Sequence, residues 1–140
     1  MALRITRVKL WAASIEDKPG GLAEKLAALA DAGANLEIVF ARRAGEQPGT
    51  GVVFLAPLKG AAQLRAAKTA GFETIKRIHS VRVEVQDSPG LTAKITRKVG
   101  AAGINLRGFS ATALNKRALI HMALDTAADA AKTVRVLRKL

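Results

Sequence analysis

A stretch of twenty residues occurs twice in this chain, with the two copies offset by 70 residues. Residues 17–36 and 87–106 align without a gap, and eight of the twenty positions are identical. The identical pairs are Asp17/Asp87, Pro19/Pro89, Gly20/Gly90, Ala23/Ala93, Ala32/Ala102, Gly33/Gly103, Asn35/Asn105 and Leu36/Leu106. Because the agreement is concentrated at residue types that form turns, it indicates an internal duplication. The chain is therefore expected to fold as two similar modules.

Each copy has the pattern of a strand, a tight turn and an amphipathic helix. Before the second copy, residues 81–85 alternate between apolar and polar side chains, as a half-buried strand does. Pro89 suits the first position of a helix, and Asp87 or Ser88 suits its N-cap. Apolar residues then recur at helical spacing until Gly103, which stands where a helix commonly ends on a left-handed residue. The sequence predicts a β-turn-α-turn-β unit, formed twice.

This unit resembles the ACT domain, a small ligand-binding module of regulators and enzymes of amino-acid metabolism. The resemblance rests on Asp87-x-Pro89-Gly90 leading into a helix and on Gly103-Ile104-Asn105-Leu106 closing it. The first copy matches slightly less well, and the two copies together cover nearly the whole chain. The resemblance implies a small ligand held near the turns, between two adjacent modules.

The order of expected elements defines the fold class. In the first half, strands are expected at residues 8–15, 35–42, 52–56 and 72–76, and helices at 20–32 and 58–70. In the second half, strands are expected at 80–86, 105–114 and 118–124, with helices after the turn at 87–90 and from about residue 126 to 140. The order βαββαβ predicts an α+β protein of two ferredoxin-like (ACT-like) modules, each an antiparallel sheet with its helices on one face. We place the first module at residues 1–77 and the second, truncated after its second helix, at 78–140.

The second module lacks a segment for its last strand, which leaves strand 80–86 without an outer neighbour. An open strand edge of this kind invites pairing. Apolar residues fall on odd positions at Leu3 and Ile5 but on even positions at Val8 and Leu10, so residues 2–6 are separable from the strand that follows. We expect this segment, or an edge strand of a second chain, to complete the second sheet.

Composition excludes several classes of function. The 140 residues contain no cysteine, so neither a disulfide framework nor a thiolate metal site is expected. No stretch has the apolar length of a signal peptide or a membrane span, which makes the cytoplasm the expected location and a membrane partner unexpected. His79 and His121 lie in predicted strands without metal-ligand spacing, and no grouping of side chains suggests an activated nucleophile. We expect no catalytic residue, no metal, no cofactor and no enzymatic activity.

Net charge is the most unusual bulk property. The chain carries +12, of which residues 1–70 contribute +4 and residues 71–140 contribute +8. One possible basic face comprises Lys94, Arg97 and Lys98 with Arg135, Arg138 and Lys139. Such a face suits nucleic acid or an acidic protein, or it is only a solvated helix surface. Four Phe, one Trp and no Tyr leave little for bases to stack on, so nucleic acid is not the expected partner.

Two hypotheses of function remain. The favoured one is a non-catalytic regulatory module that binds an amino acid, with backbone amides at Gly20-Gly21 and Gly90-Leu91 facing the carboxylate. The candidate ligand-binding residues are Asp17, Pro19, Gly20, Gly21 and Asn35 in the first copy and Asp87, Ser88, Pro89, Gly90, Leu91 and Asn105 in the second. The alternative is a regulatory or structural subunit that binds a partner enzyme or acidic macromolecule through its basic second half. In either case a homo-oligomer, most simply a dimer, is expected because modules this small are marginally stable alone.

Overall fold

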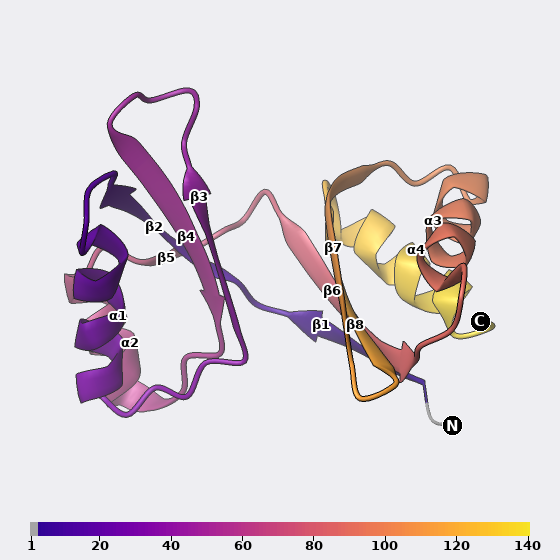
Figure 1. Ribbon diagram of the computed structural model, residues 1–140, viewed down its shortest axis with the longest axis horizontal. Coiled ribbons are helices and arrows are strands. Elements are labelled where there is room, and N and C mark those ends of the chain that lie inside the picture. The colour runs from indigo at the N-terminus through magenta and orange to yellow at the C-terminus, as the bar shows by residue number, and fades with distance from the viewer. Residues whose placement is uncertain (1–2) are drawn as a thin grey trace. The chain divides into compact units, whose positions relative to one another are not determined.

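A computed structural model describes residues 3–140 and divides the chain into two compact units (Figure 1). The first module is Lys9–Ile75, and the second combines Lys76–Leu140 with residues 3–8. The expected boundary after residue 77 is thus close to the observed one, but residues 3–8 belong to the second module rather than the first. The reason is that residues 4–8 pair with residues 80–84 of the second module. Residues 1 and 2 lie outside the described part of the chain.

The first module is an antiparallel sheet of order β3-β4-β2-β5 with α1 and α2 on one face (Figure 1). Its elements are β2 (Trp11–Glu16), α1 (Gly21–Asp31), β3 (Ile38–Arg43), β4 (Thr50–Ala56), α2 (Gly60–Thr69) and β5 (Glu73–Thr74). The strand order confirms the ferredoxin-like prediction. β5 covers only Glu73 and Thr74 of the expected residues 72–76, and the Phe72 N–H donates to Ala67 O to close α2 instead of joining the sheet.

The second module has the sheet order β1-β6-β8-β7, with α3 and α4 on one face (Figure 1). Its elements are β1 (Arg4–Val8), β6 (His79–Gln86), α3 (Leu91–Ala101), β7 (Leu106–Leu114), β8 (Arg117–Leu124) and α4 (Ala127–Leu137). β1 pairs antiparallel with β6 from Arg4↔Glu84 to Val8↔Ser80. It therefore occupies the place that β5 holds in the first module. The expected cover for the open edge is confirmed, although Ala2 of the proposed segment 2–6 lies outside the described residues.

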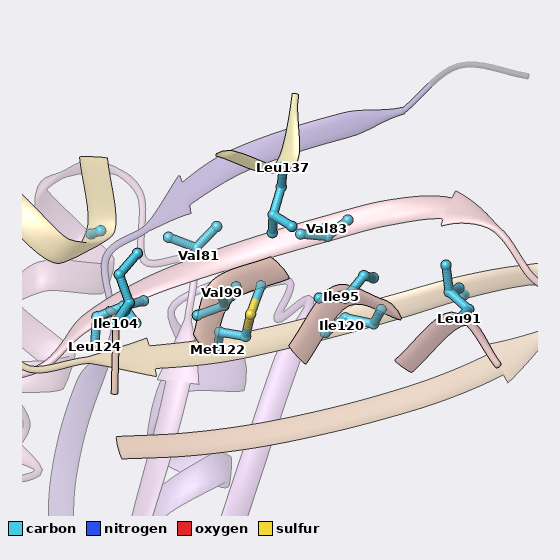
Figure 2. Packing of buried hydrophobic residues seen from close by; sticks show 12 residues of the cluster. Val81, Val83, Leu91, Ile95, Val99, Ile104, Ile120, Met122, Leu124 and Leu137 are labelled. Atoms are coloured by element: carbon cyan, nitrogen blue, oxygen red, sulfur yellow. The ribbon is translucent and has the colours of Figure 1, made fainter. Parts of the chain in front are cut away.

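The core of the second module lies between its sheet and its two helices (Figure 2). Val81 and Val83 of β6 are fully buried, as are Ile120 and Met122 of β8. The alternation of apolar residues along both strands sends these side chains to the one face that the helices cover. The helices contribute residues at helical spacing, among them Leu91, Ile95, Val99, Ala130 and Leu137. Burial of this face holds α3 and α4 on the sheet.

The two copies end their first helices in the same way. Gly33 and Gly103 are left-handed, with φ of 85° and 78°. The residue after each glycine donates its N–H to a carbonyl five residues back, from Ala34 to Leu29 over 3.1 Å and from Ile104 to Val99 over 3.2 Å. This is the Schellman arrangement, which satisfies carbonyls at the helix end. The prediction for both glycines is confirmed, and the duplication is visible in the hydrogen bonds themselves.

The hairpins that face the two turns differ in length. β7 and β8 are joined by Asn115 and Lys116 alone, both with positive φ (53° and 65°), as a two-residue type I′ turn requires. β3 and β4 are joined by residues 44–49, a loop closed by backbone hydrogen bonds between Ala44 and Thr50 and between Gln47 and Ala44. The expected tighter second hairpin is confirmed.

Candidate functional site

The duplicated turn is a β-turn that precedes each helix. Gly21 N–H donates to Lys18 O over 3.1 Å, and Leu91 N–H donates to Ser88 O over 3.2 Å. Proline at the second position and a glycine of positive φ at the third make this a type II turn; the φ values are 82° at Gly20 and 78° at Gly90. The fourth residue of the turn begins the helix.

This geometry corrects two expectations. Pro19 and Pro89 lie in the turn and not at the first helical position, and the N-caps are Gly20 and Gly90, with no side-chain hydrogen bond from an aspartate or serine. A left-handed residue before the helix turns the chain sharply, so the residues before it are not placed to cap the free amides. Glycine adopts that conformation without the penalty of a Cβ.

The amides of Gly21 and Leu91 are also not free, because each closes its turn. Gly21 is buried, and a Cβ there would lie 2.3 Å from Glu16 O, while the Leu91 side chain lies in the core of the second module. Helix geometry leaves the next two amides without an intrahelical acceptor, those of residues 22 and 23 in α1 and of residues 92 and 93 in α3. The free amides at the start of each helix thus lie one to two residues further along than expected.

The first turn is occupied by its own ion pairs. Arg43 Nε donates to the Asp17 carboxylate over 2.8 Å. Lys18 Nζ lies 2.9 Å from a Glu16 carboxylate oxygen and 3.8 Å from one of Glu24. The hydrogen bond and negative charge of Glu16, with a smaller effect of Glu24, raise the pKa of the Lys18 ammonium. Glu24 also places an acidic side chain in the first turn of α1, where it disfavours an anionic ligand.

The second turn has no such neighbours in the described part of the chain. Asp87 and Ser88 are exposed, and neither side chain has an ion pair or hydrogen bond with another described residue. The position of Glu24 is taken by Lys94, so the first turn of α3 contains a base and no acid. Lys94 was not among the residues expected at the site; comparing the aligned positions 24 and 94 would have singled it out. The second turn therefore offers one free carboxylate beside a positive helix end.

Each turn lies beside the hairpin end of its own module. Asp17 N–H donates to Gly49 O over 3.1 Å, and Asp87 N–H donates to Lys116 O over 2.8 Å. Asn35 and Asn105 are exposed and lie at the other end of the sheet. Close to Asn35, the Glu37 N–H donates to Ala56 O at the end of β4. Next to Asn105, Leu106 pairs with Leu124 at the end of β8. Within one module a whole strand therefore separates the aspartate from the asparagine, so the structure does not bring these two candidate residues together.

The remaining polar groups do not form a second centre. His79 and His121 lie in β6 and β8, and residues 3–140 contain no cluster of three metal-ligating side chains. His121 pairs across the sheet with Arg82. Burial, and secondarily the charge of Arg82, lower the pKa of the His121 imidazole, while Glu84 opposes them. Among the described helices, none is long and apolar enough to cross a membrane.

Two ferredoxin-like modules with matched β-α turns, the second completed by the N-terminal strand, define the tandem ACT fold.

No family model matches the sequence, and no curated protein is significantly similar to it. Solved structures do share the fold. A protein from Bacteroides thetaiotaomicron has a TM-score of 0.78 at 20% identity, over 96% of this chain and 89% of that one. The ligand-free regulatory subunit of aspartate kinase from Thermus thermophilus has a TM-score of 0.65 at 18% identity, over 99% and 96%. E. coli aspartokinase III, in complex with aspartate and ADP, has a TM-score of 0.60 at 14% identity, over 99% of this chain and 32% of that one.

Proposed function

We propose that this chain is a non-catalytic regulatory module that binds an amino acid at the second turn. Two similar structures are a regulatory subunit of aspartate kinase and an aspartokinase in complex with aspartate and ADP. The fold that this chain shares with them supports a regulatory role. The ligand class is argued from the charges of the turn itself.

An amino acid carries one group of each sign, and the second turn offers a counterpart for both. The amides of residues 92 and 93 and the positive end of the α3 dipole suit a carboxylate, and Lys94 adds a positive charge in the same helical turn. The Asp87 carboxylate suits the ammonium group. Ser88, Pro89 and Gly90 form the turn that holds these groups, and Leu91 anchors it to the core.

The observation that carries this proposal is the difference between the aligned aspartates. Asp17 accepts a hydrogen bond from Arg43, whereas Asp87 is left unpaired by the described chain. We therefore propose the second turn as the occupied one and assign Asp17, Pro19, Gly20 and Gly21 to the structure of the first turn. Asn35 and Asn105, at the other end of each sheet, are not part of the proposed site.

We further propose a homodimer that uses the β7 edge. β7 has nine residues and, among the described residues, a strand neighbour on one side only, so half of its backbone polar groups face outward. Leu114 and Phe109 on this strand are exposed by 72% and 38%. An apolar, unpaired edge of this length is suited to pairing with the same edge of a second chain. The mass in solution, compared between the wild type and a Phe109→Lys/Leu114→Lys variant, tests the dimer.

Calorimetric titration with the common amino acids tests ligand binding. We expect one of them to bind, and Asp87→Asn to weaken it by roughly 1.5–3 kcal/mol, the usual loss for a hydrogen bond to a charged group. Asp17→Asn is the matched control and should leave the affinity unchanged. Binding should also raise the free energy of unfolding by about 2.7 kcal/mol at a hundredfold excess over Kd. Equal effects of the two substitutions, or no binding in the millimolar range, would contradict the proposal.

A further inference from the structure

The helix pair of the second module carries a dense set of cations that the described chain does not neutralise. We call this set the basic helix face; it consists of Lys94, Arg97, Lys98, Lys132, Arg135, Arg138 and Lys139. All but the half-buried Lys98 are exposed, and none forms an ion pair within residues 3–140. The Lys132 ammonium donates to Ala102 O over 2.7 Å. Asp129 is the one acidic residue on α3 and α4.

This arrangement opposes the stability of the module that carries it. Lys94 and Lys98 are four residues apart on α3, and like charges at this spacing destabilise a helix. The first module shows that the fold does not require them. The positions aligned with Lys94, Arg97 and Lys98 are Glu24, Ala27 and Ala28 in α1.

We propose that the basic helix face docks an acidic segment of a partner protein, most simply a helix with carboxylates on one side. Arg and Lys side chains pair with carboxylates, and guanidinium groups do so through two parallel hydrogen bonds. Exposed alanine and glycine lie among the cations, at Ala93, Gly100, Ala101 and Ala128, so a second helix can approach closely. Lys132 and Arg135 lie on α4, and Arg138 and Lys139 follow directly after its last residue, so the cations continue past the C-terminal end of the helix.

The same side chains are poorly suited to nucleic acid. Neither α3 nor α4 contains an aromatic residue, an asparagine or a glutamine, so the face has no ring on which bases could stack and no amide that could read adenine. The Thr96 hydroxyl already donates to Thr92 O over 2.8 Å. Contacts of Lys and Arg with phosphates, and of Arg with guanine, remain available, so the experiment has to separate nucleic acid from an acidic protein.

The experiment titrates the full chain with a fluorescein-labelled helical peptide that carries glutamate on one face. It is run at an ionic strength of about 0.15 M, where exposed charges more than ~8 Å apart are largely screened. The test variant is Arg135→Ala/Arg138→Ala/Lys139→Ala, which leaves Asp87 and Lys94 intact. The control removes the same net charge from the helix pair of the first module, as Lys59→Ala/Arg65→Ala/Lys68→Ala. All six side chains are exposed, so both variants should keep the fold.

We expect the test variant to bind the peptide at least about tenfold more weakly than the wild type, a difference of 1.4 kcal/mol, while the control variant stays unchanged. Equal losses in both variants would overturn the proposal, because bulk charge would then explain the binding. It would also be overturned by the absence of binding, or by a duplex DNA that binds the wild type more tightly than the peptide does. If the test variant unfolds by circular dichroism, Arg97→Ala/Arg135→Ala replaces it. Since amino-acid binding is measured separately, failure of one proposal leaves the other standing.

Discussion

Arg43 Nε donates a 2.8 Å hydrogen bond to the carboxylate of Asp17, and this contact separates two turns whose backbones are nearly identical. Both turns have the same glycine conformation, the same closing hydrogen bond and the same bond from the aspartate N–H to the neighbouring hairpin. The duplication thus preserved the backbone of the turn and changed the charges around it. A difference in ligand binding between the copies should follow from side chains alone.

Giving the first turn the charges of the second should therefore create a second ligand site. In the variant Glu24→Lys/Arg43→Ala, Asp17 loses its guanidinium partner and the first turn of α1 gains a base where it had an acid. We expect calorimetric stoichiometry to rise from one amino acid per chain toward two. A stoichiometry that stays at one would mean that features other than these charges distinguish the turns, such as Gly21 in place of Leu91.

We expect Gly90 to be required because of its left-handed backbone conformation and not because a side chain at this position would clash with its neighbours. Its φ is 78°, and no atom lies within 4 Å of the position of an added Cβ. We expect Gly90→Ala to lower the free energy of unfolding by roughly 1–2 kcal/mol, the cost of a left-handed alanine. Gly90→Asn should cost less, because asparagine tolerates this region. Denaturant unfolding of both variants checks the order; equal costs would point to steric contact instead.

Loss of β1 should destabilise the second module specifically. Ile5 lies in β1 and packs on the core of that module, and the strand pairs with β6 from Ser80 to Glu84. Deleting residues 2–6 should lower the melting temperature, and Ile5→Ser should do so to a smaller extent. Arg4→Ala is the control, since Arg4 is exposed and lies 3.8 Å from the half-buried Glu84, and ion pairs at the surface contribute about 0–1 kcal/mol. An unchanged melting temperature in the deletion variant would show that the edge does not need a cover.

Stability should depend on pH through His121. Its pKa in the folded protein is lowered from the usual 6.5 by burial and by Arg82, so below pH 6.5 the unfolded chain takes up a proton that the folded chain resists. Stability should be complete above this value and fall as the pH drops toward the folded pKa. Denaturant midpoints at about pH 7.5 and about pH 5.5 should differ less in His121→Gln than in the wild type. An identical difference in both proteins would remove His121 as a source of the pH dependence.

Elements with strong local signals were predictable from the sequence. The alternation along residues 81–85 and the helical spacing of Ile95 and Val99 reflect one-sided burial, and Gly33 and Gly103 report a required left-handed conformation. The completion of the second sheet was predictable because the change of parity between Ile5 and Val8 indicated two separate strands, although β1 continues to Val8 and the break lies at residues 9 and 10. All of these are properties of a residue and its neighbours in sequence.

The details of the turn were not predictable in the same way. The motif Asp-x-Pro-Gly is equally compatible with a proline at the first helical position and with a type II turn. Only the φ angles of Gly20 and Gly90 distinguish these two conformations. The separation of Asp87 from Asn105 depends on strand register, which a single sequence does not specify. Likewise, the partner of Asp17 comes from Arg43, 26 residues away, once β3 and β4 have paired.

The register of β1 changes how the connectivity of the chain is understood. Val8 lies opposite Ser80, and β1 runs antiparallel to β6, so these two strands form a β-hairpin whose connecting loop contains residues 9–75. The first module is thus an insertion within the second and not its neighbour in sequence. Excision of residues 9–75 would leave four residues, 76–79, between the paired Val8 and Ser80, a common length for a hairpin loop. During synthesis β1 is made before β6, so β1 can pair with β6 only after the whole inserted module has been synthesised.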